Sequence, residues 1–206
     1  MIIGIVGLIG SGKGTVGDIL IEQGFKHESF ANSLKDAASS VFNWDRELLE
    51  GITPKSRAWR EGVDEWWSER LGIPNFSPRV ALQLLGTEVF RNHFHQDIWI
   101  LGLESRIKDS TDNIVLTDAR FPNEIDMVRR LGGVIVRVKR GDDPAWFNFA
   151  ATQPENMFQV HPDIHASEYS WVGVTPNYLI TNDGTMEDLN TVVTDLLQDL
   201  LGSNPT

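Results

Sequence analysis

The segment from Gly7 to Thr15, with the sequence G-L-I-G-S-G-K-G-T, contains the residue types of a phosphate-binding loop. Its glycines allow the backbone to turn sharply, so that several amide N–H groups can face one concave site. A helix after the loop adds its positive end, and Lys13 adds a full positive charge. The pattern predicts binding of the phosphates of a nucleoside triphosphate. The residues expected to bind them are Gly10, Ser11, Gly12, Lys13, Gly14 and Thr15.

The last residues of this loop indicate how a magnesium ion would be held. In many phosphate loops a serine or threonine directly after the lysine binds magnesium through its hydroxyl group. Here Gly14 occupies that position and Thr15 follows it, and this ending resembles that of adenylate kinase and related nucleotide kinases. We therefore expect magnesium to be held largely by water, phosphate and carboxylate, with Thr15 and Asp118 contacting it through water.

Asp118, Arg120 and Arg140 stand where phosphate chemistry would need charge. The carboxylate of Asp118 follows a short apolar run and can hold the water shell of magnesium or help to bind an acceptor; its alternative role is a helix N-cap. The planar guanidinium of Arg120 suits a phosphate, with a surface ion pair as the alternative. Arg140 ends another apolar run and can neutralise charge on the transferring phosphoryl group, unless it is an ordinary surface arginine. With Lys13, these three are the predicted catalytic residues.

A second group of polar residues lies on the stretch 78–93, which is predicted to be an amphipathic helix. Spacing by four residues puts these side chains on one face, which could grip an acceptor phosphate and base or simply be solvated. Lys35, on the predicted helix 31–42, is equally a candidate for the acceptor phosphate and for an exposed helix lysine. The residues spaced by four are Arg79, Gln83, Thr87 and Arg91.

Composition narrows the class of protein. The 206 residues include 18 Lys and Arg against 29 Asp and Glu, for a net charge of −11, so a basic face for nucleic acid is not expected. The chain has no cysteine, which excludes disulfides and cysteine zinc sites. No apolar run approaches the roughly 20 residues that span a bilayer. We expect a soluble cytoplasmic protein with no membrane partner, and the sequence leaves a homodimer open.

The predicted elements position these residues. Short apolar strands are expected at 2–6, 113–117, 133–138 and 178–181, with a weaker one at 25–30. Helices are expected at 14–23, 31–42, 78–93, 96–108, 122–131 and 185–201. The alternation predicts an α/β fold of three layers, in which helices cover both faces of a parallel sheet. Ligands of such sheets bind beyond the carboxyl ends of the strands, where the phosphate loop and Asp118 both fall.

Two stretches depart from this alternation. Residues 43–78 are rich in Trp, Arg and Glu and are predicted to form a helical insertion. Residues 141–168 contain three prolines and are predicted to be irregular, as a mobile lid. We therefore expect a single domain over 1–206, with an acceptor-binding helical insertion at about 43–93 and a lid at about 141–169.

Several further segments, in this order along the chain, resemble the deoxynucleoside monophosphate kinases of tailed bacteriophages of the T-even type. Region 43–78 departs from that pattern, which leaves the choice of base open. The matching segments are Phe30-Ala31, Leu34-Lys35-Asp36-Ala37, Arg79, Leu82 to Glu88, Asp118-Ala119-Arg120, Asn123-Glu124, Gly132 to Ile135, Arg140, His165 to Glu168, and Leu179 to Gly184.

The resemblance implies a P-loop kinase that transfers the γ-phosphoryl group of ATP to a deoxynucleoside monophosphate with magnesium. It implies donor contacts near the base from Asn182, Asp183 and Gly184. The acceptor residues that it favours are Lys35, Arg79, Gln83, Thr87, Asp118, Arg120 and Glu168. Two alternatives remain: a small-molecule kinase similar to dephospho-coenzyme A kinase, and an ATP-binding regulatory module without an acceptor.

Two other features favour structural roles, and a third concerns the faces of a strand. His161 and His165 flank Asp163, but the proline between them gives this spacing little weight as a metal site. Trp59, Trp66 and Trp67 could stack on a nucleobase, but such clusters more often form the inside of an insertion. Alternation along 133–138 puts Arg137 and Lys139 on one face and Arg140 on the other.

Overall fold

The computed structural model describes residues 1–202, and the chain divides into two units. The sheet unit contains residues 1–29 and the chain from residue 107 onwards; the helical unit is Phe30–Arg106. The helical unit is wider than the insertion expected at 43–93, and the assignment of the whole chain as one domain stays a prediction.

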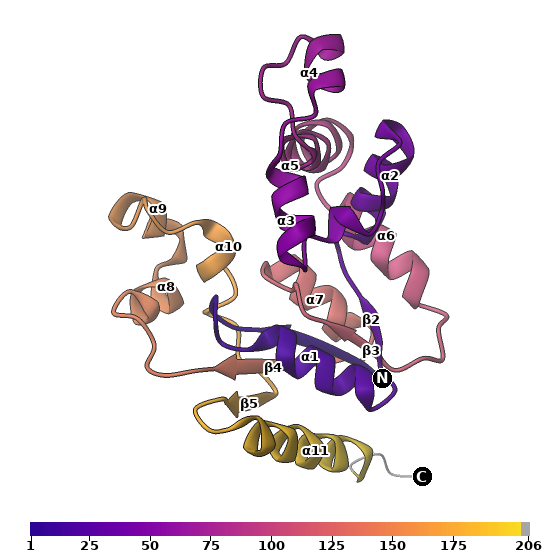
Figure 1. The fold of residues 1–206 in the computed structure, drawn as a ribbon. Coiled ribbons are helices and arrows are strands. Elements are labelled where there is room, and N and C mark those ends of the chain that lie inside the picture. The colour runs from indigo at the N-terminus through magenta and orange to yellow at the C-terminus, as the bar shows by residue number, and fades with distance from the viewer. Residues whose placement is uncertain (203–206) are drawn as a thin grey trace. The chain divides into compact units, whose positions relative to one another are not determined.

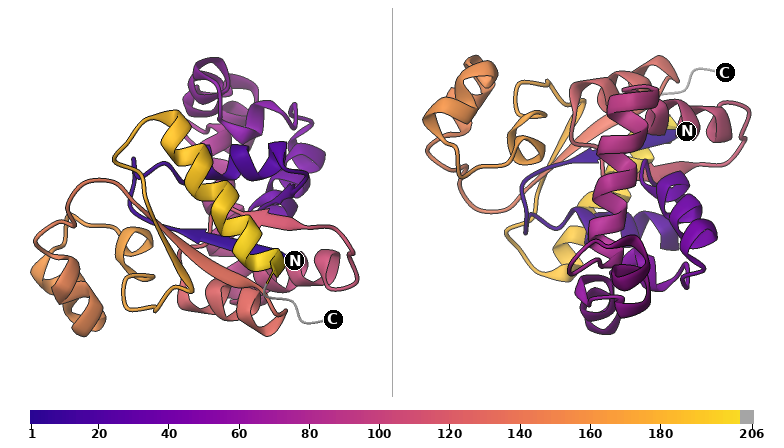
Figure 2. Two further views of the ribbon diagram at one scale, coloured as in Figure 1. Left: turned by 90° about the horizontal axis from the view of Figure 1, so that it is seen from below. Right: turned by 90° about the horizontal axis from the view of Figure 1, so that it is seen from above.

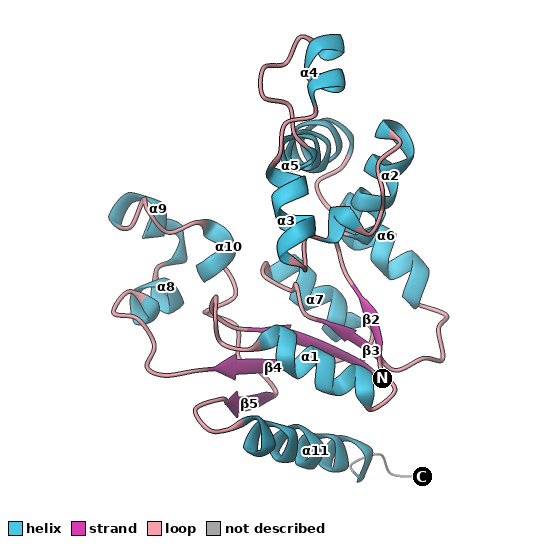
Figure 3. Cartoon of the chain, viewed as in Figure 1, coloured by secondary structure: helices cyan, strands magenta, loops and turns pink. Residues whose placement is uncertain are grey.

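The sheet unit is built on a parallel sheet of five strands in the order β2-β3-β1-β4-β5 (Figure 1). The central strand, β1, is buried along its whole length, as its apolar and β-branched residues predict. All five predicted strands are confirmed to within a few residues (Figure 3). Their bounds are β1 Ile2–Val6, β2 Lys26–Glu28, β3 Ile114–Leu116, β4 Val134–Lys139 and β5 Tyr178–Thr181.

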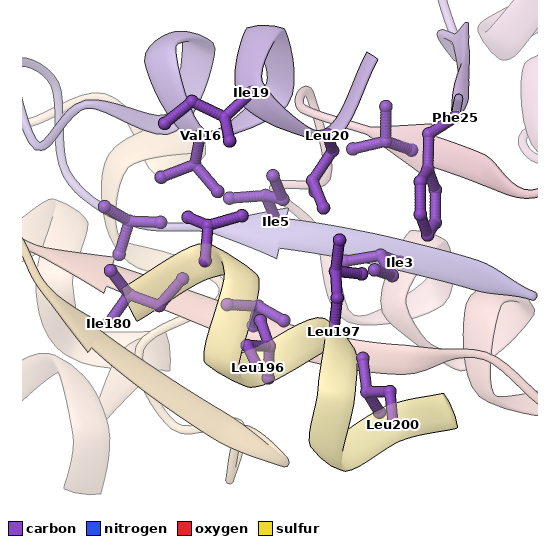
Figure 4. Close-up of a cluster of buried hydrophobic side chains, with 14 of the residues drawn as sticks. Ile3, Ile5, Val16, Ile19, Leu20, Phe25, Ile180, Leu196, Leu197 and Leu200 are labelled. Atoms are coloured by element: carbon purple, nitrogen blue, oxygen red, sulfur yellow. The ribbon is translucent and has the colours of Figure 1, made fainter. Parts of the chain in front are cut away.

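Helices cover both faces of this sheet. The helices α1 (Lys13–Glu22) and α11 (Met186–Gly202) pack on one face, and α7 (Pro122–Arg130) packs on the other against β1 and β4 (Figure 2). Figure 4 shows the apolar side chains that α1 and α11 bury against the strands. The predicted three-layer α/β fold is therefore confirmed. The labelled members of this core are Ile3, Ile5, Val16, Ile19, Leu20, Phe25, Ile180, Leu196, Leu197 and Leu200.

The stretch predicted to be irregular is instead a series of short helices. The side chains of Phe147, Met157, Tyr169 and Trp171, in or just after this stretch, are buried. The prolines break the stretch into short helices but do not prevent helix formation, because proline is tolerated in a first turn. The helices are α8 Phe147–Thr152, η3 Pro154–Asn156, α9 Met157–Val160 and α10 Ala166–Tyr169.

The helical unit confirms the expected helical insertion. Its core is aromatic: Phe42 stacks on Trp44 at 4.4 Å between ring centroids, and Trp67 meets Phe42 edge-on at 5.0 Å. Its helices are α2 Asn32–Phe42, η1 Leu48–Glu50, α3 Pro54–Glu61, α4 Glu65–Leu71, α5 Pro78–Gln83, η2 Leu84–Phe94 and α6 Ile98–Ile107, the last residue of which falls in the sheet unit.

The three tryptophans considered for base stacking have different surroundings. Trp59 and Trp67 pack against the aromatic core. Trp66 is 57% exposed, and the guanidinium of Arg70 lies 5.5 Å from the centre of its ring. Two of the three are therefore structural, as the composition of the insertion favoured.

The expected single α-helix at 78–93 is wrong after Gln83. From Leu84 to Phe94 the chain forms a π-helix, η2, whose hydrogen bonds reach five residues back rather than four. The indole N–H of Trp99 donates to the carbonyl of Gly86 at 3.0 Å in the buried interior and holds this helix from the side. Residues spaced by four do not stay aligned on one face through such a change of period.

The core of the sheet unit provides a test of the fold. Leu20 is fully buried between α1 and the sheet, whereas its neighbour Ile21 is 41% exposed. We expect Leu20→Ala to lower the free energy of unfolding by about 2–5 kcal/mol, because it leaves a cavity. Ile21→Ala, as the matched control, should change it by less than ~0.5 kcal/mol. Urea unfolding followed by circular dichroism measures both, and equal losses would contradict the packing of α1.

Candidate functional site

The phosphate loop connects β1 to α1 at the carboxyl edge of the sheet. Gly12, the N-cap of α1, has φ 99°, in the left-handed region that favours glycine. A Cβ on Gly7 would lie 2.3 Å from the carbonyl oxygen of Val138, and one on Gly12 would lie 2.3 Å from Nδ2 of Asn182. Both glycines are therefore required by close packing as well as by backbone shape.

The Lys13 ammonium group lies inside this loop. Its Nζ donates to the carbonyl oxygens of Gly7 and Leu8, each at 2.7 Å. The pKa of Lys13 is lowered from 10.5 to about 8, mainly by burial and also by the nearby charge of Arg120, whereas the charge of Glu168 acts to raise it. Two predicted site residues, Arg120 and Glu168, are thus close enough to Lys13 to act on its charge.

Asp118 lies at the same edge of the sheet, two residues after β3. Ser29, directly after the neighbouring strand β2, donates its hydroxyl hydrogen to Oδ2 of Asp118 at 2.6 Å. The alternative of a helix N-cap is excluded, because Phe121 occupies the N-cap of α7. The structure therefore brings the carboxylate of Asp118 to the edge from which the phosphate loop leaves the sheet, as expected.

Glu124 is a buried carboxylate that the sequence did not single out as a site residue. It accepts hydrogen bonds from the backbone N–H groups of Arg120 at 2.8 Å and Phe121 at 3.1 Å. These bonds fix the chain that carries the exposed Arg120 side chain. The signal that could have revealed it is the spacing of a capping box, with a glutamate three residues after the N-cap.

A cavity of about 280 Å³ opens beside the phosphate loop. Arg137 and Lys139 both pair with Asp143 there, which confirms that they share a face of β4. The guanidinium of Arg137 also lies 4.3 Å from the centre of the Phe147 ring. The exposed Arg140 lines the same cavity. The lining residues are Leu8, Ile9, Gly10, Ser11, Arg137, Val138, Lys139, Arg140, Asp142, Asp143 and Pro144.

The turn after β5 contacts both the phosphate loop and the end of β4. Asn182 donates from Nδ2 to the carbonyl of Ser11 at 2.9 Å, and Asp183 accepts from the backbone N–H of Gly141 at 2.6 Å. The expected donor-binding turn therefore lies against the loop, but these two side chains also bind the protein itself. Gly184 follows in the turn before α11.

The remaining predicted acceptor residues belong to the helical unit. Lys35 is only 13% exposed and pairs with Glu50 at 2.5 Å, so it is not the exposed helix lysine of the alternative interpretation. Burial raises the pKa of the Glu50 carboxyl, but hydrogen bonds from Lys35 and Arg46 outweigh burial and lower it overall.

The expected polar stripe is only partly regular. Arg79, on α5, pairs with Glu61 at 2.7 Å. Gln83 and Thr87 are exposed, whereas Arg91, on η2, is half-buried. Their role in acceptor binding stays a prediction.

Within residues 1–202, no group of three or more His, Cys, Asp or Glu side chains is arranged to bind a metal ion. His165 caps α10, and the ring of His161 packs edge-on against Phe149 at 6.1 Å. Thr15 is half-buried in the first turn of α1. The contact of Thr15 and Asp118 with magnesium through water stays a prediction.

Comparison with known proteins supports a particular family. Residues 68–193, more than half of the 206, match the family described as deoxynucleotide monophosphate kinase. A protein of Acanthamoeba polyphaga mimivirus that bears the same description is 30% identical over 155 residues, covering 68% of this chain and 74% of that protein.

Two phage enzymes extend this similarity. The deoxynucleoside-5'-monophosphate kinase of Escherichia phage T5 is 28% identical over 182 residues, covering 63% of this chain and 72% of the enzyme. The deoxynucleotide monophosphate kinase of Enterobacteria phage T4 is 25% identical over 187 residues, covering 87% of this chain and 66% of the enzyme.

The lowered pKa of Lys13 predicts proton uptake on binding of a polyphosphate. A bound anion favours the ammonium form and raises the pKa again. Near pH 8 about half of the Lys13 side chains are neutral before binding, so binding should take up roughly half a proton there and almost none at pH 6.5. Affinity should fall as the pH rises through about 8.

Calorimetry of tripolyphosphate binding, in buffers that differ in ionisation enthalpy, measures this uptake. Lys13→Met is the control, because it removes the titrating group and should abolish the difference between pH 6.5 and pH 8. A wild-type chain whose proton uptake equals that of Lys13→Met at both pH values would contradict the assignment.

Proposed function

The chain belongs to the deoxynucleotide monophosphate kinase family, and we propose that it transfers the γ-phosphoryl group of ATP to the phosphate of a deoxynucleoside monophosphate, giving the diphosphate and ADP. Family membership supports a phosphotransferase that acts on a nucleoside monophosphate. One observation supports this site above the others: the half-buried Lys13 ammonium group lies inside a glycine loop, and Arg120 is close enough for its charge to act on Lys13.

The phosphate loop would hold the donor. Lys13 has two carbonyl partners in its own loop, and phosphate oxygens would replace or join them when the triphosphate binds. Gly7 and Gly12 let the loop pack closely against Val138 and Asn182, which supports its shape. The turn at 182–184 would border the donor base. These features support ATP as the donor.

The residues present also fit magnesium. Magnesium bound with the triphosphate would supply positive charge that offsets the charge of the phosphates. Asp118 and the hydroxyl of Thr15 would orient its water ligands. Ser29 would hold the Asp118 carboxylate in place through its hydrogen bond. Since no dense cluster of carboxylates is present within residues 1–202, phosphates and water would supply most of the ligands.

Catalysis would depend on positioning and charge. The acceptor oxygen belongs to a phosphate that is already ionised, so it needs no strong general base. Lys13, Arg120 and Arg140 would neutralise charge on the transferring group. Glu124 would act as a positioning residue for Arg120, because it fixes that part of the backbone. Closure of residues 141–169 as a lid would exclude water and limit hydrolysis of ATP.

The polar residues of α5 and η2 would contribute to acceptor recognition, as would Glu168. Gln83 and Thr87 are exposed, whereas Arg79 would have to share its guanidinium between Glu61 and a ligand. Lys35 would have to share its ammonium group between Glu50 and the acceptor phosphate. The choice of base would depend on residues of 43–78, where the chain departs from the phage pattern.

Location and assembly stay predictions. No helix within residues 1–202 has the length and apolar character that crossing a membrane requires. A cytoplasmic location is the expectation from the sequence, which also leaves a homodimer open.

A coupled assay of ADP release across the common deoxy- and ribonucleoside monophosphates tests the function. We expect release that depends on at least one deoxynucleoside monophosphate. Lys13→Ala should reduce this turnover by at least ~100-fold, because it removes the charge at the terminal phosphates. The control is Lys108→Ala, since Lys108 is an exposed lysine outside the loop.

The same assay separates the alternatives. A coenzyme precursor that outcompetes every nucleotide would select a small-molecule kinase. ATP binding without release of ADP for any acceptor would select a regulatory module.

Gln83 provides the test of the acceptor stripe. Gln83→Ala should raise the KM for the deoxynucleoside monophosphate about tenfold, which corresponds to the loss of one good hydrogen bond, and leave the KM for ATP unchanged. Asn92→Ala is the matched control, because Asn92 is an exposed amide on the adjacent η2 that bonds Glu88. Equal effects of the two variants, or a rise confined to the KM for ATP, would remove Gln83 from the acceptor site.

A further inference from the structure

We propose that Asn182 is a positioning residue that holds the peptide between Ser11 and Gly12 in the orientation needed to bind phosphate. This inference rests on the proposed binding of a triphosphate by the phosphate loop. Asn182 acts through the loop, and its role requires no contact with the nucleotide. Ser11 precedes Asn182 by 171 residues in the sequence, yet the side-chain amide of Asn182 donates to the Ser11 carbonyl at 2.9 Å.

The contact is tight and has a defined direction. A carbonyl oxygen only accepts hydrogen bonds, so the Asn182 group that faces Ser11 is the amide nitrogen. The same nitrogen lies 2.3 Å from the position that a Cβ atom on Gly12 would occupy. The Asn182 side chain is therefore packed against both residues of the peptide that it holds.

This bond fixes where the Gly12 N–H group points. In a planar trans peptide the C=O and N–H bonds point in opposite directions. Since the Ser11 carbonyl points at Asn182, the Gly12 N–H points away from it. Backbone N–H groups of a phosphate loop bind the anion only when they point into the loop, and a rotated peptide would present a carbonyl oxygen instead.

Gly12 makes this external anchor necessary. Glycine reaches left-handed and right-handed backbone shapes at similar cost, so a peptide beside Gly12, at φ 99°, can rotate more easily than one between larger residues. The loop needs glycine here for its left-handed backbone and for the close approach of Asn182, and the same glycine weakens the loop's hold on the peptide orientation. Asn182 supplies the hold from outside.

The turn that carries Asn182 is itself fixed. The backbone N–H of Asn182 donates to the carbonyl of Lys139 at 2.7 Å, at the end of β4. The carboxylate of the next residue, Asp183, accepts from the N–H of Gly141 at 2.6 Å. The backbone of Asn182 is thus held by the sheet. Its side-chain amide is therefore a fixed partner for the loop.

The affinities for ATP and for tripolyphosphate, measured by calorimetry, test the proposal. Asn182→Ala and the similarly sized Asn182→Leu should each weaken both ligands by about tenfold, because both ligands use the loop amides. Asn190→Ala is the matched control, since Asn190 also donates from Nδ2 to a backbone carbonyl, that of Met186 at 3.0 Å on α11. It should leave both affinities unchanged. Thermal unfolding of each variant confirms that the chain is folded.

The outcomes separate this inference from the proposed function. Loss of ATP affinity with unchanged tripolyphosphate affinity would overturn it, because Asn182 would then act on the base or ribose. Unchanged affinity for both ligands would also overturn it. A wild-type chain that does not bind tripolyphosphate would remove the proposed donor role of the loop, and with it any phosphate-binding amide for Asn182 to hold.

Discussion

The Lys13 ammonium group, half-buried against the carbonyl oxygens of Gly7 and Leu8, is the interaction on which the site depends. A positive charge removed from water needs partners. Burial is the main cause of the lowered pKa of about 8, and the charge of Glu168 offsets that burial only in part. A polyphosphate at this loop would supply further negative charge to the ammonium group.

The parallel sheet brings distant parts of the chain to this charge. The loop follows β1, Asp118 follows β3 and Arg140 follows β4, and all of these strands end at one edge. Carboxylates then fix the polar groups there: Glu124 holds the backbone of Arg120, and Asp143 pairs with both Arg137 and Lys139. Arg120, Arg137 and Lys139 are thus positioned by carboxylates of neighbouring residues.

Local patterns predicted the parts of the molecule that depend on local chemistry. The strand at 2–6, the strand at 178–181 and the phosphate loop each follow from residue type and spacing, and Asp118 follows from its place at a strand end. The π-helix η2 could not be predicted in this way, because no local pattern marks the change of period after Gln83; the bond from Trp99 to Gly86 within it is a tertiary contact. The partners of Lys35 and Asn182 are likewise contacts between segments that the sequence does not place together.

Phosphorus NMR of the chain with ATP, magnesium and a deoxynucleoside monophosphate tests the central claim most directly, because it identifies the atom that receives the phosphoryl group. The account predicts that the β-phosphate signal of the deoxynucleoside diphosphate grows in step with the signals of ADP. Formation of ADP with inorganic phosphate, and with no diphosphate from any deoxynucleoside monophosphate, would contradict it.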